Sequence, residues 1–276
     1  MIEIPEAVVL SRQFVDIYQG KKIVEVIAAQ SPHKFAWYYK DPSAYPAKLV
    51  GKSILDAYPM AGRVEVVAGD CLLNFGEGAV LRHYAAGEMV PNKHQLFVGF
   101  EDGSALLGTV AMYGMFMCFY PGENDEDKFY MTAKTAISPL AEGFDKDYFN
   151  SLIDEKTTKL SAKAFLATEQ RIPGLGNGVL QDILFNARIH PKRKINSLTE
   201  DEVQALFISV KETLQEMVDC GGRDTEKDLY GEKGGYTTKM SRFALDNACP
   251  ECFGSVTKET YLGGTVYYCK SCQKTQ

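Results

Sequence analysis

The sequence contains no long uninterrupted hydrophobic run, no basic leader at its start and no excess of positive charge. Its apolar runs are short and broken by charged residues, which argues against a transmembrane helix. Residues 1–6 are acidic and lack the basic region of a secretion signal. With 30 Lys and Arg against 36 Asp and Glu, the net charge is −6, so we do not expect a protein that coats nucleic acid by bulk charge.

Cysteine is concentrated at the end of the chain. Four of the seven cysteines form two CxxC pairs separated by sixteen residues: Cys249, Cys252, Cys269 and Cys272. Two such pairs are typical of a tetrahedral site with four thiolates around one structural zinc ion. The alternative is two disulfides or free core thiols. The odd number of remaining cysteines suits a reducing cytosol, so we expect a cytoplasmic protein.

The residues between the two CxxC pairs alternate like two short strands around Gly263-Gly264. This pattern predicts a β-hairpin, and a module of this size needs its metal to fold. Because four thiolates leave no open coordination position for water, the predicted zinc ribbon is structural. The chemistry of the protein must therefore lie elsewhere in the chain.

The periodicity of the remaining chain predicts an α+β fold. Residues 6–18 follow a helical pattern, residues 22–120 a strand pattern with period two, and residues 138–222 a second helical pattern. We expect helix starts at Asp145, Ser151, Ser161 and Ser197, the last with an overlapping capping possibility at Thr199. The predicted parts are an N-terminal helix with an antiparallel β-sandwich (1–130), a helical domain (131–222), a flexible loop (223–240) and the ribbon (241–276).

Two segments of the helical part could bind phosphate. The glycine-rich turn at 171–178 precedes an amphipathic helix, so its backbone N–H groups and Asn177 could hold an anion. A plain helix connector with Asn177 as a cap explains the same residues equally well. The densest basic run lies at 188–194 and contains His190, Lys192, Arg193 and Lys194.

Taken together, these motifs resemble the formamidopyrimidine-DNA glycosylase / endonuclease VIII family. The resemblance is carried by the CxxC ending and by four further segments: Glu3-Ile-Pro-Glu6, Gly174-Leu-Gly-Asn177, the run from Phe185 to Pro191, and Gly221-Gly222. It implies a helix-two-turn-helix domain between the sandwich and the ribbon, and a ribbon hairpin that enters the minor groove. It also implies a monomer that acts on damaged double-stranded DNA in the cytoplasm, where the chromosome lies.

The resemblance assigns roles to individual residues. In this family the amine of the residue after a removed Met1 attacks the sugar, a glutamate handles protons, and the damaged base is flipped out first. The catalytic candidates are accordingly Ile2, Glu3 and Glu6. The DNA-binding candidates are Asn177, His190, Lys192, Arg193 and Lys194.

The sequence departs from the family where catalysis is expected. Ile2 stands in place of the usual proline, and the lysine of the β-domain falls on Arg63 or Asp70. The arginine of the hairpin tip falls on Gly264, and the residues that probe the base stack fall near Met112 and Tyr113. We therefore predict a DNA glycosylase with weak or absent AP-lyase activity. The alternatives are a catalytically inactive module that binds DNA lesions or structures, and an adaptor for other proteins.

Overall fold

The computed structural model describes residues 1–110 and 112–275. The chain forms two compact units. The first consists of residues 1–134 together with 226–234, and the second of 135–225 together with 235–276. Among the described residues, no helix is both long enough and apolar enough to cross a membrane.

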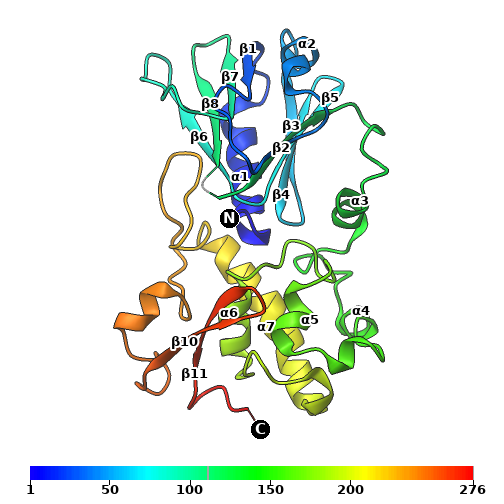
Figure 1. Cartoon of the computed structure of the whole chain (residues 1–276), viewed down its shortest axis with the longest axis vertical. Coiled ribbons are helices and arrows are strands. Elements are labelled where there is room, and N and C mark those ends of the chain that lie inside the picture. Colours follow the sequence, from blue (N-terminus) through cyan, green and yellow to red (C-terminus); the bar gives the residue numbers. More distant parts are fainter. Residues whose placement is uncertain (111, 276) are drawn as a thin grey trace. The chain divides into compact units, whose positions relative to one another are not determined.

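Helix α1 (Ile4–Tyr18) opens the first unit, two residues before the start predicted from its periodicity. Glu3 caps it in a reciprocal capping box with Glu6, which satisfies N–H groups that the first turn leaves unpaired. Gly20, at φ 84°, follows its end. The buried face of α1 includes Leu10, Phe14 and Tyr18, and in Figure 1 the helix runs alongside both sheets of this unit.

The sheets of the first unit are a five-stranded sheet in the order β2-β9-β5-β4-β3 and a four-stranded sheet in the order β1-β7-β8-β6. Except for the parallel pair of β2 with β9, neighbouring strands run antiparallel. The strands are β1 (Ile23–Ala28), β2 (Ala36–Tyr38), β3 (Ile54–Met60), β4 (Arg63–Ala68), β5 (Cys71–Gly76), β6 (Ala79–Tyr84), β7 (Leu96–Phe100), β8 (Ala105–Val110) and β9 (Gly114–Phe119). Short helix α2 (Tyr45–Leu49) lies between β2 and β3 in the chain.

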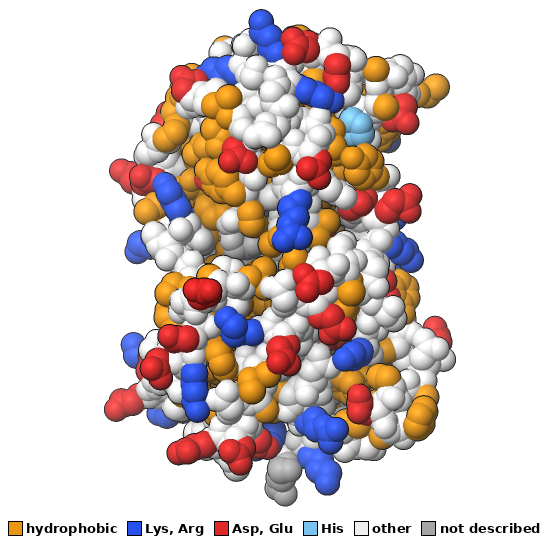
Figure 2. Space-filling view, turned by 180° about the vertical axis from the view of Figure 1, so that it is seen from behind, with side chains coloured by type: hydrophobic (Ala, Val, Ile, Leu, Met, Phe, Trp, Pro, Cys, Tyr) orange, Lys and Arg blue, Asp and Glu red, His pale blue; other side chains and the backbone are white. Residues whose placement is uncertain are grey.

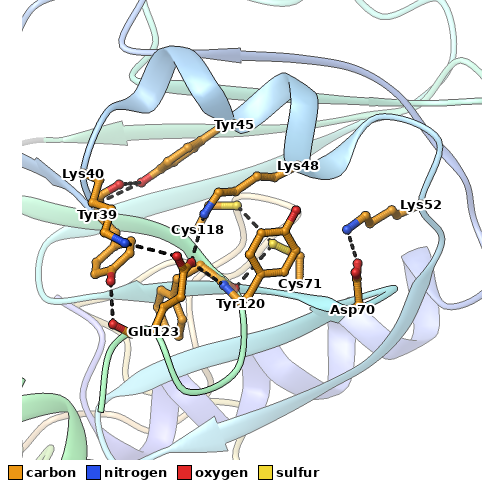
Figure 3. Close-up of polar contacts among 11 residues, drawn as sticks. Tyr39, Lys40, Tyr45, Lys48, Lys52, Asp70, Cys71, Cys118, Tyr120 and Glu123 are labelled. Carbon is orange, nitrogen blue, oxygen red and sulfur yellow. Dashed lines mark hydrogen bonds and ion pairs between the residues drawn. The ribbon is translucent and has the colours of Figure 1, made fainter. Parts of the chain in front are cut away.

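One end of the five-stranded sheet is fixed by the polar network in Figure 3. Glu123 accepts hydrogen bonds from Lys40 and Lys48 at 3.1 Å each, which holds the turn after β9. The thiols of Cys71 and Cys118 lie 3.7 Å apart beneath this turn. These contacts give the polar segment after β9 a defined position on the sheet.

The α-helices of the second unit are α4 (Lys146–Ser151), α5 (Ala162–Ala167), α6 (Leu180–Asn186) and α7 (Glu200–Asp219), and α3 (Lys128–Thr135) crosses the boundary between the units. Three of the four helices α4 to α7 begin after a capping side chain, and α6 begins after Val179 without one. Asp145 caps α4 and Ser161 caps α5, as predicted. Ser151 instead ends α4. Of the two overlapping caps at the last helix, Thr199 is the one used, because its hydroxyl and Glu202 form a complete capping box.

The C-terminal hairpin pairs β10 (Val256–Tyr261) with β11 (Gly264–Cys269) in antiparallel register. Asp182 of α6 fixes the segment that leads to it, because its buried carboxylate accepts the backbone N–H groups of Lys239 at 2.9 Å and Met240 at 2.7 Å. The predicted fold class is therefore confirmed, with the parallel β2–β9 pair as the one departure from an antiparallel sandwich.

The segment 226–234 belongs to the first unit although it lies far along the chain. Leu229 is fully buried in the core of the first unit, and its carbonyl accepts the N–H of His83 at 2.8 Å. Gln13 of α1 binds both Asp228 and the N–H of Leu229. This part of the loop that the sequence predicts to be flexible is thus anchored to α1 and β6, and its mobility stays a prediction.

Candidate active site and nucleic-acid interface

The start of the chain is built into the core of the first unit. The backbone N–H of Ile2 donates to the carbonyl of Glu77 at 2.8 Å, and the Ile2 side chain is buried. Next to Glu77, Gly78 lets the chain lie close to Tyr113, because a Cβ at position 78 would lie 2.2 Å from the Tyr113 carbonyl oxygen. Met1 is exposed, and its amine pairs with Glu226. The nitrogen of residue 2 therefore has a fixed place while Met1 extends beyond it.

Glutamate residues follow this nitrogen in the chain and also lie near Tyr113. Glu3 and Glu6 are both buried, at 3 % and 6 % exposure, and the side chains of both take part in the capping box of α1. Burial raises the pKa of the Tyr113 hydroxyl, and the nearby carboxylates of Glu77 and Glu3 raise it further. We call the set Ile2, Glu3, Glu6, Glu77 and Tyr113 the N-terminal cluster. It brings the three predicted catalytic residues together in one place.

Of the two positions suggested for the family's lysine, only Arg63 lies near this cluster. Burial lowers the pKa of Arg63, and its strongest opposing influence is the Glu77 carboxylate. Glu65, Asp127 and Tyr130 also act on its charge. Asp70 lies at the opposite end of the β4–β5 hairpin and pairs with Lys52 (Figure 3). Acidic groups of the first unit therefore act on the Arg63 charge, but the effect of burial outweighs them.

In the second unit, Asn177 lies in the turn before α6 and contacts the C-terminal hairpin. Its Nδ2 donates to the carbonyl of Thr265 at 2.9 Å, and Gln181 of α6 donates to the same carbonyl at 2.8 Å. The Asn177 Oδ1 is buried and has no hydrogen-bond partner among the described residues. We call Lys163, Asn177, Gln181 and Thr265 the turn–hairpin cluster.

The sequence analysis identified only Asn177 of this cluster, and the charged member that it missed is Lys163 of α5. Its ammonium is buried, donates to the Tyr261 carbonyl at 2.5 Å, and has a pKa lowered by burial. A Cβ at Gly264 would lie 3.2 Å from the Lys163 Nζ and 3.4 Å from the Asn177 Oδ1. The one available signal was a single lysine in the otherwise apolar helix Ala162–Ala167.

The basic run at 188–194 does not form one cationic surface. Arg193 binds both carboxylate oxygens of Glu202 and also the Ser197 carbonyl. Lys192 pairs with Glu259, whereas Lys194 is exposed and has no ion pair among the described residues. On the face shown in Figure 2, basic side chains are likewise interspersed with acidic ones. Phosphate contacts by this run stay predictions, and Lys194 is the member best placed for one.

His190 is buried and packs against an aromatic ring of the C-terminal hairpin. Only 4 % of it is exposed, and its ring centroid lies 4.4 Å from that of Tyr268 in an edge-on arrangement. Its Nδ1 accepts the backbone N–H of Lys192 at 3.2 Å, and burial lowers its pKa. The structure thus explains His190 without a ligand, and a phosphate contact by its ring stays a prediction.

The four cysteines predicted as ligands converge at the base of the C-terminal hairpin. The sulfur atoms of Cys249, Cys252, Cys269 and Cys272 all lie within 4.8 Å of one another. This is the spacing of ligands around a single ion, so the cluster could hold a metal. Phe185, Met240 and Val256 pack around it, which joins the metal site to the second unit's core.

A helix-plus-sandwich unit, a helical unit with a glycine-rich turn and a four-cysteine hairpin together define a helix-two-turn-helix protein of the DNA-repair type. Residues 135–228 match the family described as "Formamidopyrimidine-DNA glycosylase H2TH domain". A formamidopyrimidine-DNA glycosylase of Brevibacillus brevis is 28 % identical over the full length of both chains. One of Cytobacillus firmus is 25 % identical, with 99 % of this chain and 100 % of that protein covered.

Solved structures show the same fold over nearly the whole chain. The MutM (Fpg) protein of Thermus thermophilus matches with a TM-score of 0.80 and 23 % identity, covering 98 % of both chains. Lactococcus lactis Fpg, in a complex with DNA that contains an abasic site, matches with a TM-score of 0.83 and 22 % identity, covering 99 % of both. Over nearly the whole chain, the sequence and the fold are therefore similar to formamidopyrimidine-DNA glycosylases, and residues 135–228 match the H2TH domain of that family.

Proposed function

We propose that the protein is a base-excision DNA glycosylase that removes damaged or modified bases from double-stranded DNA and cuts the strand weakly or not at all. The observation that carries this proposal is the fixed nitrogen of Ile2 beside buried Glu3 in the N-terminal cluster. The name of the relatives, formamidopyrimidine-DNA glycosylase, supports the same reaction. The solved complex of the Lactococcus lactis protein with abasic-site DNA supports the same partner.

In the proposed reaction, removal of Met1 frees the Ile2 nitrogen as a primary amine. The lone pair of this amine attacks C1′ of the nucleotide, and the electron pair of the glycosidic bond leaves with the base. Glu3 takes up and returns the protons that this exchange requires, and its side chain is held next to the reacting nitrogen in the chain. The Glu77 carbonyl keeps the attacking nitrogen in place.

We expect weak strand cleavage because the resemblance places a lysine and an arginine at positions where this chain has other residues. Arg63 is only 6 % exposed and acidic groups, Glu77 foremost, act on its charge, so it is poorly placed to assist a departing phosphate. Position 264 is a glycine and carries no side chain. The proposed chemistry therefore stops mainly at base removal, with the turn–hairpin cluster positioning the DNA backbone.

The metal that suits the four-cysteine cluster is zinc. Four thiolates in a tetrahedral arrangement are typical of structural zinc, and they leave no place for a reacting water. Its role is to hold the β10–β11 hairpin, whose turn lies next to Lys163 and Asn177. The proposed partner is damaged double-stranded DNA, bound by a monomer in the cytoplasm.

The proposal is tested by trapping the covalent intermediate with borohydride on a duplex with one abasic site. We expect protein released from a cleavable tag to begin at Ile2 and to form the adduct. Protein that retains Met1 should form it roughly 100-fold more slowly, because its amine is displaced by one residue. An intact-mass spectrum identifies each N-terminus. Equal trapping of both proteins would contradict the role of the Ile2 amine.

The alternative is a protein of the same fold that binds damaged DNA without excising a base. The names of the relatives, which are glycosylases, do not favour it. Its distinguishing result is DNA binding by the Ile2-terminated protein with neither adduct nor base release on a panel of oxidised bases. Base release without an adduct would instead indicate a glycosylase that uses a water nucleophile.

We expect Asn177→Ala to weaken DNA binding about 10-fold irrespective of base sequence, because it removes a hydrogen-bonding side chain from the turn. Gln181→Ala is the matched control, since Gln181 donates to the same Thr265 carbonyl from the neighbouring helix. Fluorescence anisotropy with two unrelated duplexes measures both variants. Equal losses in the two variants would mean that Asn177 acts only by anchoring the hairpin.

A further inference from the structure

Strand β2 of the first unit presents two large aromatic side chains to solvent. Phe35, just before the strand, is 47 % exposed, and Trp37 within it is 43 % exposed. Their neighbours turn the other way: Tyr38 packs against the core and donates to the Gln95 carbonyl at 3.1 Å. The exposed rings thus follow from the alternation of a strand whose other face is occupied.

Backbone pairing with β9 and a ring contact with Tyr113 position Phe35 and Trp37 beside the N-terminal cluster. The parallel pairing of β2 with β9 places Trp37 opposite Met115, and the N–H of Gly114 donates to the Phe35 carbonyl at 2.9 Å. The Trp37 ring lies 5.8 Å from that of Tyr113, at an interplanar angle of 39°. The Tyr113 hydroxyl in turn lies 3.8 Å from the Met1 sulfur. We call Phe35, Trp37 and Tyr113 the aromatic ridge.

Glu77 and Glu3 act on the Tyr113 end of the ridge, whereas the segment that carries Phe35 and Trp37 is basic in a protein whose net charge is −6. Residues 26–40 contain no Asp or Glu, and they include His33, Lys34 and Lys40. The Lys34 ammonium lies 5.3 Å from the centre of the Phe35 ring, and Lys34 has no ion pair among the described residues. Lys40 is already paired with Glu123. Lys34 is therefore the cation available to a ligand on the ridge.

Open aromatic faces beside an unpaired cation are the combination that binds unpaired nucleotides. Bases stack on the rings whatever their identity, and the cation accompanies the phosphate backbone. A paired duplex buries its base faces and cannot use such rings. A protein partner could cover the apolar area, but it would not explain the exposed Lys34 ammonium beside the Phe35 ring in a segment without acidic residues.

From these observations we infer that the aromatic ridge is a stacking platform for unpaired DNA nucleotides near the base that is removed, with Lys34 on their phosphate. This inference rests on the proposed glycosylase function and extends it to the substrate: damaged bases within or next to unpaired stretches are bound more tightly than the same bases in uninterrupted duplex.

The chain provides its own probe, since Trp37 is its single tryptophan. We expect single-stranded oligothymidylate to quench the Trp37 fluorescence as bases stack on the indole. Trp37→Ala should weaken binding to a duplex with a short unpaired stretch about 5-fold or more, the effect of losing one base–aromatic stack. Binding to the fully paired duplex should change less than about 2-fold. Trp37→Phe, which keeps a ring, should restore most of the loss.

Phe129→Ala is the matched control, because this ring is 64 % exposed in the same unit but lies outside the ridge. Lys34→Ala should weaken the salt-dependent part of single-strand binding. Unchanged Trp37 fluorescence, or equal losses on paired and unpaired DNA, would overturn the inference while duplex binding and base removal still support the proposed function. Absence of both duplex binding and base removal would instead contradict the proposed function itself.

Discussion

We expect Cys249→Ser to release the bound zinc and to lower DNA affinity on the order of 100-fold, which corresponds to about 2.7 kcal/mol. Cys249 is fully buried, and its thiol belongs to the four-cysteine cluster whose sulfur atoms lie within 4.8 Å of one another. A module as small as this hairpin takes its folding free energy largely from its metal. Without zinc, the end of the hairpin that packs on Phe185 and Met240 loses its anchor.

Zinc content by mass spectrometry and DNA affinity by anisotropy measure the two effects on the same samples. Cys220→Ser is the matched control, because this cysteine is exposed and lies outside the cluster. We expect it to change neither quantity. Retained DNA affinity in a zinc-free Cys249→Ser protein would show that the hairpin is not part of the DNA-binding surface.

Glu3→Gln should slow base excision by roughly 100- to 10,000-fold, the usual contribution of a general acid or base. The substitution separates the two roles that Glu3 can have. Its side chain caps α1 by accepting a backbone N–H, and glutamine keeps an oxygen that can accept the same bond. Glutamine cannot transfer a proton. We therefore expect a large loss of rate with a melting temperature within a few degrees of the unsubstituted protein.

Single-turnover excision by Ile2-terminated protein gives the rate, and a thermal melt gives the stability. Glu226→Gln neutralises another carboxylate near the chain start, the one that pairs with the Met1 amine, and should leave the rate of Ile2-terminated protein nearly unchanged. If Glu3→Gln keeps full activity and only lowers the melting temperature, Glu3 is a helix cap and the proton transfer belongs elsewhere.

The features that could be predicted from the sequence are those set by local chemistry. The spacing of the CxxC pairs was enough to predict the cysteine cluster, because neighbouring ligands must share one ion. Asp145 and Ser161 were recognised as caps since their side chains act within one helical turn. Between Ser197 and Thr199 the sequence left a choice, which the complete capping box with Glu202 decides.

Features that depend on distant residues could not be predicted in this way. Glu77 lies beside Ile2 only because α1 packs along the β-sheets, and Lys163 meets Gly264 only because the hairpin returns to α5. The basic residues at 188–194 are equally plausible phosphate ligands in the sequence. In the structure, however, Arg193 is bound by Glu202 and His190 is buried. Burial and pairing of single side chains are properties of the assembled fold.

The anchored segment 226–234 has a consequence for the order in which the protein can be made. Leu229 closes the core of the first unit, and burying a leucine contributes about 1.5–3 kcal/mol. A ribosome that has translated the first 134 residues has therefore not yet supplied everything this unit needs. The N-terminal half reaches its final stability only after most of the second unit has been synthesised, so maturation of the two units is linked through the covalent path of the chain.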